Sequence, residues 1–421
     1  MRTTLDDGPH PAVESSEALH TLVTQLWQPA DGTPTIRATL DRAPAGHRVV
    51  ERYAIVPDPA RARFLVPLTT RASAAASVGR YNGLRPLRTR AARTLLGLGF
   101  RSGLAPLLMR RTLVISAPGD LPDASLADHL LTAHLSGILG GPLAAGISVR
   151  EPDPNLKPIL QLFRPDGQPA GFAKIGWNEA TRRLVTREAR ATAAVRHAVP
   201  ARLPELVHHG SWRGREVVVT APLPPGVRRH PDPDRPLDPR IPLSIAESTG
   251  ISTMPLAESG YWRRLAAEAG GMAGETPAAI VAAMRRIEAV HGRTRVRFGR
   301  WHGDWTPWNL GWDGQDLWIW DWEHSTAEVP VGFDLLHWRF QVAVAMRDLP
   351  LDDGVEAVRA AARAELGEAG VPAGDRGLLA ALYLLEMFVR TCRLEQGGRG
   401  WHSRVFPEAM LPILREMETM G

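Results

Sequence analysis

The stretch WHGDWTPWNLGWDGQDLWIWDWE, residues 301–323, carries the most informative pattern of the chain. It sets three polar residues, Asp304, Asn309 and Asp321, among tryptophan and aliphatic residues. Carboxylates are rare in such apolar surroundings unless they are paired, hydrogen-bonded or bound to a metal. Phosphoryl transfer needs this set, because one carboxylate orients the attacking hydroxyl while an amide and a second carboxylate hold magnesium. The stretch therefore predicts a phosphotransferase site.

Composition is that of a soluble globular protein with two or three domains. Of the 421 residues, 44% are hydrophobic and 23% are charged. The net charge is +5, and only two of the 50 basic residues are lysines, Lys157 and Lys174. We interpret the arginine excess as coding composition and expect no nucleic-acid partner, because nucleic-acid binding requires a clustered basic patch.

Neither the single cysteine nor the N-terminus points to export. Cys392 excludes an intramolecular disulfide and argues against a cysteine-based zinc site. The N-terminus MRTTLDDGPHP lacks the apolar segment of a secretory signal. Since no uncharged apolar run is long enough to span a bilayer, we expect a cytoplasmic protein with no transmembrane segment.

Residues 1–122 are predicted to form an extra N-terminal domain of α/β type, whose first 35 or so residues are flexible apart from a helix at SSEALHTLVTQLW. Alternating patterns bounded by turn residues predict strands at 35–40, 49–56, 63–68 and 112–116. Residues 78–111 contain eight arginines and no acid. This segment predicts peripheral membrane contact, or else partly buried helices with solvated arginines, broken by the glycines and proline of residues 97–106.

Residues 123–421 are predicted to form two lobes that are joined by a connecting segment. Residues 123–221 predict a small antiparallel sheet with a packed helix, from strand patterns at 143–149, 158–163, 170–176 and 215–220 and helical patterns at 125–139 and 181–197. Residues 222–240 are a proline-rich hinge or connection, and residues 241–421 are predicted to be a helical lobe that contains the catalytic loop. The predicted fold class is therefore α+β, with two lobes.

Two further residues complete the expected chemistry. Lys174 lies in the strand pattern GFAKIG, and Glu188 lies on the helix that follows. A nucleotide-dependent phosphotransferase needs a strand-borne cation for the phosphates and a helix-borne carboxylate to orient it. The alternative for Lys174 is a chance surface lysine. Lys157, in the loop DPNLKP, is expected to be solvated.

Lys174 with Glu188, HGDWTPWN, LWIWDWE and VGFDLLHW together resemble the aminoglycoside phosphotransferase and choline kinase family, relatives of the protein kinases. The resemblance covers about residues 125–421. It implies a protein-kinase-like fold, with a small sheet lobe, a larger helical lobe, and ATP or GTP with Mg²⁺ in the cleft between them. The loop REPDPNLKP contains no glycine, which favours the small-molecule branch over a protein kinase.

Carried over residue by residue, the resemblance assigns the site. Asp304 is the catalytic base or hydroxyl-positioning acid. Asn309 and Asp321 are magnesium ligands, and Asn309 also counts as catalytic. Lys174 contacts the nucleotide phosphates, and Glu188 is its ion-pair partner.

Supporting roles follow from the same resemblance. Glu323 assists the metal through water, or is a surface acid at a strand end. Asp334 hydrogen-bonds the backbone of the catalytic loop, caps a helix, or does both. His302 braces the loop, and His324 and His337 are interpreted as packing or surface residues.

The predicted activity is transfer of the γ-phosphate to a hydroxyl group of a small molecule. A sugar, amino sugar, aminoglycoside, choline-like alcohol or homoserine-like alcohol all remain open as acceptors. The first alternative is a kinase-like binding module without activity, recruited to a partner or membrane through its N-terminal domain. The second is nucleic-acid binding through Arg80–Arg111, and the oligomeric state is left open.

Overall fold

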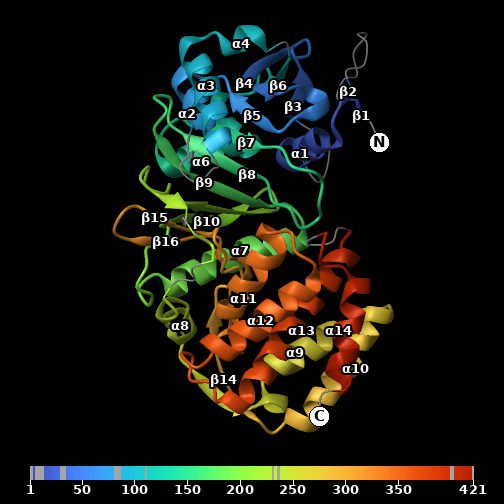
Figure 1. Ribbon diagram of the computed structural model, residues 1–421. Helices are drawn as coiled ribbons and strands as arrows, with labels where there is room; N and C mark the ends of the chain where they lie inside the picture. The colour runs from blue at the N-terminus through green and yellow to red at the C-terminus, as the bar shows by residue number, and fades with distance from the viewer. Residues whose placement is uncertain are drawn as a thin grey trace. The chain divides into compact units, whose positions relative to one another are not determined.

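The computed structural model describes residues 3–4, 14–28, 35–79, 87–109, 111–229, 232–234, 238–398 and 403–419 (Figure 1). The chain divides into two compact units. Unit 1 contains residues 1–186 and 204–227, and unit 2 contains residues 187–203 and 228–421. No helix among these described residues is long and apolar enough to cross a membrane.

Unit 1 is built on a nine-stranded sheet in the order β10-β11-β9-β8-β7-β5-β4-β6-β3. Every neighbouring pair in this sheet is antiparallel. The strands are β3 (Arg37–Leu40), β4 (His47–Val56), β5 (Phe64–Pro67), β6 (Thr112–Pro118), β7 (Ala144–Ser148), β8 (Ile159–Phe163), β9 (Pro169–Gly176), β10 (Leu206–Trp212) and β11 (Arg215–Thr220). The predicted strands are all present, whereas β10 was not predicted.

Helices cover both faces of this sheet because side chains alternate along each strand. Tyr53 and Ile55 of β4 face a core shared with α1 and α6, whereas Ala54 faces a second core shared with α2 and α3. The helices are α1 (Glu17–Trp27), α2 (Arg71–Gly79), α3 (Leu87–Ser102), α4 (Ala105–Leu108), α5 (Leu126–His129), α6 (Leu131–Leu139) and α7 (Glu179–Val195), the last of which runs on into unit 2. A short pair, β1 (Thr3–Thr4) and β2 (Glu14–Ser15), precedes α1.

The N-terminal strands join the same sheet as the strands that follow them in the sequence. β5 pairs with β7 through Phe64 opposite Ser148 and Leu65 opposite Ile147. The sheet therefore runs without interruption from the N-terminal strands into those expected in the N-lobe. The predicted boundary between residues 122 and 123 does not coincide with a boundary between compact units.

Helix α1, which the sequence SSEALHTLVTQLW predicted, is fixed at both ends. The Ser16 hydroxyl accepts a hydrogen bond from the Leu19 N–H at 3.2 Å. At the other end the Arg215 guanidinium of β11 donates to the carbonyls of Gln25 (2.8 Å) and Gln28 (2.6 Å). Residues 5–13 and 29–34 lie outside the described part of the chain.

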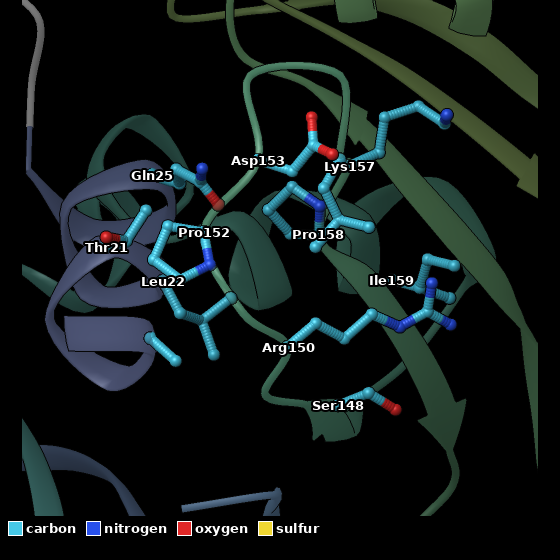
Figure 2. A pocket seen from close by; sticks show the side chains of 12 residues that line it. Thr21, Leu22, Gln25, Ser148, Arg150, Pro152, Asp153, Lys157, Pro158 and Ile159 are labelled. Carbon is cyan, nitrogen blue, oxygen red and sulfur yellow. The ribbon is translucent and has the colours of Figure 1, made fainter. Parts of the chain in front are cut away.

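The helix break expected within residues 97–106 is present, whereas the expectation for Lys157 was wrong. Helix α3 runs through Gly97 and Gly99 and ends before Gly103, which has a φ of 84°. A Cβ at Gly99 would lie 3.2 Å from the Ala105 Cβ, so this glycine permits close packing. Lys157 is buried rather than solvated, on a loop that packs against α1 around a cavity of about 20 Å³, room for roughly one water (Figure 2).

Unit 2 is mostly helical around a central helix, α13 (Arg376–Gln396), in which every residue from Leu378 to Cys392 is buried (Figure 1). The other helices are α8 (Arg240–Glu247), α9 (Gly260–Gly270), α10 (Glu275–His291), α11 (Phe333–Gln341) with a π-helical turn at Val342–Met346, α12 (Leu351–Glu365) and α14 (Pro407–Thr419). Two three-stranded sheets complete the unit: β12 (Arg228–Arg229), β15 (Leu310–Trp312) and β16 (Leu317–Ile319), and β13 (Ser252–Pro255), β14 (Arg295–Trp301) and β17 (Thr326–Pro330). The predicted α+β class, with helices concentrated in the C-terminal part, is confirmed.

Candidate active site

The sequence HGD, residues 302–304, follows directly after β14 as a loop, and its glycine is required by geometry. Gly303 has a φ of 79°, and a Cβ at this position would lie 2.3 Å from the carbonyl oxygen of His324. Side chains rarely adopt this φ, and no shift of a flexible group would relieve the contact with a backbone atom. The loop can therefore pass close to His324 only with glycine here.

Asp334, in the first turn of α11, holds the same loop through its backbone. Its Oδ2 accepts the His302 N–H at 2.7 Å, and its Oδ1 accepts the Gly303 N–H at 3.1 Å. Burial raises the pKa of Asp334 to about 7, although both backbone bonds act to lower it. The N-cap of α11 is Gly332, so the Asp334 carboxyl group serves the loop and not the helix end.

His302 is a neutral brace whose tautomer follows from its partners. Its Nε2 lies 3.1 Å from the carbonyl oxygen of Trp320, so Nε2 carries the proton and donates it. Its Nδ1 accepts the Asp304 N–H at 3.2 Å. Burial lowers the pKa of His302 to about 4, against the attraction of Asp304 and Asp321. The ring is therefore uncharged near neutral pH and lies within electrostatic range of both acids.

The Asp304 side chain is held by two neighbours yet remains 23% exposed. Its Oδ2 accepts from Asn309 Nδ2 at 2.7 Å, and its Oδ1 lies 3.5 Å from His337 Nε2. Because the Asn309 amide nitrogen is engaged with Asp304, its Oδ1 is the atom left to bind a cation. The carboxylate is thus oriented and still accessible to a small acceptor.

Two residues that touch this loop were not identified from the sequence. His337 is fully buried and not a surface residue, with its Nδ1 3.0 Å from the Tyr383 hydroxyl. Arg390 of α13 is also buried, donates to the Gly303 carbonyl at 2.9 Å and lies over the Trp301 ring at 5.2 Å. An arginine within the apolar run of residues 378–395 was the sequence signal that could have revealed this contact.

The second acid, Asp321, lies in a turn, although the sequence LWIWDWE has the alternating pattern typical of a strand. β16 ends at Ile319, Asp321 has a φ of 70°, and Trp322–His324 form a 3-10 turn. Even so, the carboxylates of Asp321 and Glu323 converge with that of Glu188, all within 4.8 Å of one another. We call these three residues the carboxylate trio. Oxygen donors of this kind suit a hard divalent cation such as Mg²⁺.

Of the nearby tryptophans, Trp305 and Trp322 belong to a buried core with Trp338 and are unavailable to a ligand. Trp308 is 43% exposed. The Trp308 ring is therefore accessible to solvent, while the buried rings of Trp305 and Trp322 pack against His302.

Lys174 lies on β9, where it pairs with Ile159 on one side and Val218 on the other. It belongs to unit 1, whereas Glu188 lies on the part of α7 that belongs to unit 2. The predicted ion pair between them stays a prediction, as do the roles assigned to the other site residues.

Neither a protein-family model nor a curated protein matches the chain. Solved structures do match. A macrolide 2'-phosphotransferase from Brachybacterium faecium is 14% identical, with 68% of this chain and 96% of that chain covered and a TM-score of 0.38. A thermostable aminoglycoside phosphotransferase APH(4)-Ia variant with ADP and hygromycin B is 12% identical (69% and 99% covered, TM-score 0.42). A glucosamine kinase is 13% identical (72% and 84% covered, TM-score 0.35).

These proteins are small-molecule kinases with a protein-kinase-like fold, the class that the sequence motifs resemble. With TM-scores of 0.35 to 0.42, the likeness is distant.

Proposed function

We propose that the chain is a phosphotransferase that uses ATP or GTP with Mg²⁺ to phosphorylate a hydroxyl group of a small molecule. The observation that carries the proposal is the arrangement around His302. Its Nδ1 accepts the Asp304 N–H at 3.2 Å, and its Nε2 donates to the carbonyl of Trp320, the residue before Asp321 of the carboxylate trio. One accessible acid can therefore serve the acceptor while a separate acidic group holds a cation. Phosphoryl transfer requires this division.

Asp304 orients the acceptor hydroxyl toward the γ-phosphate and accepts its proton as the new bond forms. Asn309 and His337 fix the carboxylate, and Asp334 and Arg390 fix the backbone that carries it. Magnesium, when bound, neutralises charge on the nucleotide phosphates. The carboxylate trio, with the Asn309 Oδ1, would hold it.

Turnover is tested by incubating the full chain with ATP, Mg²⁺ and a panel of sugars, amino sugars, aminoglycosides and amino alcohols. We expect ADP release that depends on one acceptor class, and a product that carries one added phosphoryl group. Nucleotide binding without turnover on any acceptor would instead favour the non-catalytic module.

The alternative of a non-catalytic module is favoured by three exposed leucines of unit 1, which lie on α3 and just after it. Leu95 is 70%, Leu98 is 57% and Leu104 is 61% exposed, in a segment without acidic residues. Co-sedimentation with anionic lipid vesicles, together with an absence of turnover, is the outcome that would support recruitment to a membrane.

The proposed roles of Asp321 in metal binding and of Lys174 in phosphate binding can be distinguished by titrating variants with nucleotide. Asp321→Asn should abolish the Mg²⁺-dependent part of nucleotide affinity, because it removes one carboxylate of the trio. Lys174→Met should weaken binding both with and without Mg²⁺, since it removes a direct phosphate contact. Calorimetry with ADP, with and without Mg²⁺, measures both. An Asp321→Asn chain that keeps its full response to Mg²⁺ would contradict the metal role.

A further inference from the structure

Tyr383 of the central helix α13 is connected to Asp304 through His337. The Tyr383 hydroxyl lies 3.0 Å from His337 Nδ1, and His337 Nε2 lies 3.5 Å from Asp304 Oδ1. Both Tyr383 and His337 are fully buried. Arg390, two turns further along α13, donates to the Gly303 carbonyl at 2.9 Å. One helix therefore acts on the side chain of Asp304 and on the backbone that precedes it.

The direction of the hydrogen bond between Tyr383 and His337 follows from their protonation states. Burial raises the pKa of Tyr383 well above its ordinary value, so its hydroxyl keeps the proton. A buried hydroxyl needs an acceptor, and within the described part of the chain His337 is the residue to which this hydroxyl is hydrogen-bonded. Burial also lowers the pKa of His337, so its ring is neutral. Nδ1 is therefore the unprotonated nitrogen that accepts from Tyr383, and Nε2 carries the proton.

The groups around His337 Nε2 favour the same tautomer. A carboxylate oxygen only accepts hydrogen bonds, so an unprotonated Nε2 would set its lone pair against Asp304 Oδ1 in a buried place. An N–H at Nε2 instead attracts the carboxylate. Gln341 Nε2 lies 3.2 Å from this ring nitrogen. A half-turn of the Gln341 amide presents its oxygen at that position, as an N–H on His337 requires.

We propose that Tyr383 is a positioning residue, which keeps the proton of His337 on Nε2 and thereby fixes the orientation of the Asp304 carboxylate. Asn309 Nδ2 holds Oδ2 of this carboxylate at 2.7 Å, and His337 holds Oδ1, so two contacts restrain its rotation. The second contact is long, as catalytic hydrogen bonds often are before substrate binds. The inference rests on the proposed function, because it assumes that Asp304 orients the acceptor.

Variants of Tyr383 and His337 test the inference in a double-mutant cycle. Tyr383→Phe keeps the ring and removes the hydroxyl, which allows the proton of His337 to move to Nδ1. We expect kcat to fall about 5- to 10-fold, the value of one hydrogen bond, with no change in the KM for ATP. In His337→Gln the side-chain amide can donate to Asp304 from the position of Nε2 without help from Tyr383. This variant should keep most of its activity, and adding Tyr383→Phe to it should cause no further loss.

The matched control is Tyr261→Phe, which removes another fully buried hydroxyl of unit 2, one that donates to the Leu382 carbonyl of α13 at 3.0 Å. It should lower the melting temperature, as Tyr383→Phe does, and leave kcat unchanged. Two results would show that Tyr383 only packs and would overturn the inference. One is an equal loss of kcat in Tyr261→Phe and Tyr383→Phe. The other is a Tyr383→Phe loss of the same size with and without His337→Gln.

A second readout needs no turnover. Nitrogen NMR shifts of a histidine ring distinguish a protonated from an unprotonated nitrogen, and the His337 signals are those that disappear in His337→Gln. In the unmodified chain Nε2 should be protonated and Nδ1 unprotonated, and Tyr383→Phe should shift the population toward the other tautomer. A proton on Nδ1 in the unmodified chain would overturn the inference. If the unmodified chain phosphorylates no acceptor, the proposed function fails, and the ring shifts still test the tautomer that Tyr383 is proposed to select.

Discussion

Asp304→Asn should lower phosphoryl transfer by about 10²- to 10⁴-fold, the range expected when a general base is removed. The substitution keeps the size of the side chain and a carbonyl oxygen toward Asn309 Nδ2, so the loop should keep its conformation. Nucleotide affinity should be unchanged, because the carboxylate trio is untouched. Steady-state turnover and ADP calorimetry measure the two effects separately.

The matched control is Asp316→Asn, which alters a surface acid of the same segment that pairs with Arg202. Its turnover should equal that of the unmodified chain. Full activity in Asp304→Asn would remove the carboxylate from the mechanism, and equal losses in both variants would show a nonspecific effect on folding.

Deleting residues 1–122 should unfold unit 1. The deletion removes α1 and β3–β6, and with them about half of the core that also contains Leu131, Leu160 and Val217. The lost buried side chains include Leu19, Leu22, Tyr53, Ile55, Leu65, Leu113 and Ile115. Burial of one such side chain stabilises a fold by about 1.5–3 kcal/mol, so the loss of all seven is comparable to the roughly 5–15 kcal/mol stability of an ordinary domain.

Hydrogen exchange of the β7–β9 amides measures this effect. We expect protection in the full chain and none in a chain that begins at Asp123. A chain lacking only residues 1–13 keeps α1 and the whole nine-stranded sheet, and it should retain protection. If β7–β11 melt cooperatively in the chain that begins at Asp123, the N-terminal strands are a separate domain.

Local patterns in the sequence were sufficient to predict eight of the nine strands of the large sheet and the helices α1, α6 and α7, because burial on one face repeats along each element. They also brought Asp304 and Asn309 together, since only four residues of loop lie between them. The pairing of β5 with β7 could not be predicted from the sequence. Alternation tells which face of a strand is buried but not which strand lies beside it.

The same limit explains the residues that were missed around the site. Arg390 meets Gly303 across 87 residues of chain, and His337 meets Tyr383 across 46. Such contacts depend on how α13 packs against the rest of unit 2, and the spacing of residues along the sequence does not predict that packing. The turn at Asp321 was missed for a different, local reason. A non-glycine residue with positive φ is uncommon, and the sequence around Asp321 has the alternating pattern of a strand.

Asp334 and His302, the two braces of the catalytic loop, have a joint consequence for acid stability. Between about pH 4 and 6.5 the folded loop holds one proton on Asp334, whose pKa is about 7, and none on His302, whose pKa is about 4. In the unfolded chain the aspartate loses its proton and the histidine gains one, because their pKa values return to the ordinary 3.8 and 6.5. The proton count is then equal in both states, and these residues leave stability independent of pH in this window.

Removing one of the two residues should remove that balance. In Asp334→Asn, His302 alone would make unfolding take up a proton, so stability should decline as the pH falls from 6.5 toward 4. Urea unfolding at several pH values measures the slope, and an unchanged slope in the variant would contradict the pairing. Because the effects of Asp334 and His302 on the pH dependence of stability cancel, the loop that carries Asp304 should stay folded in mildly acidic solution.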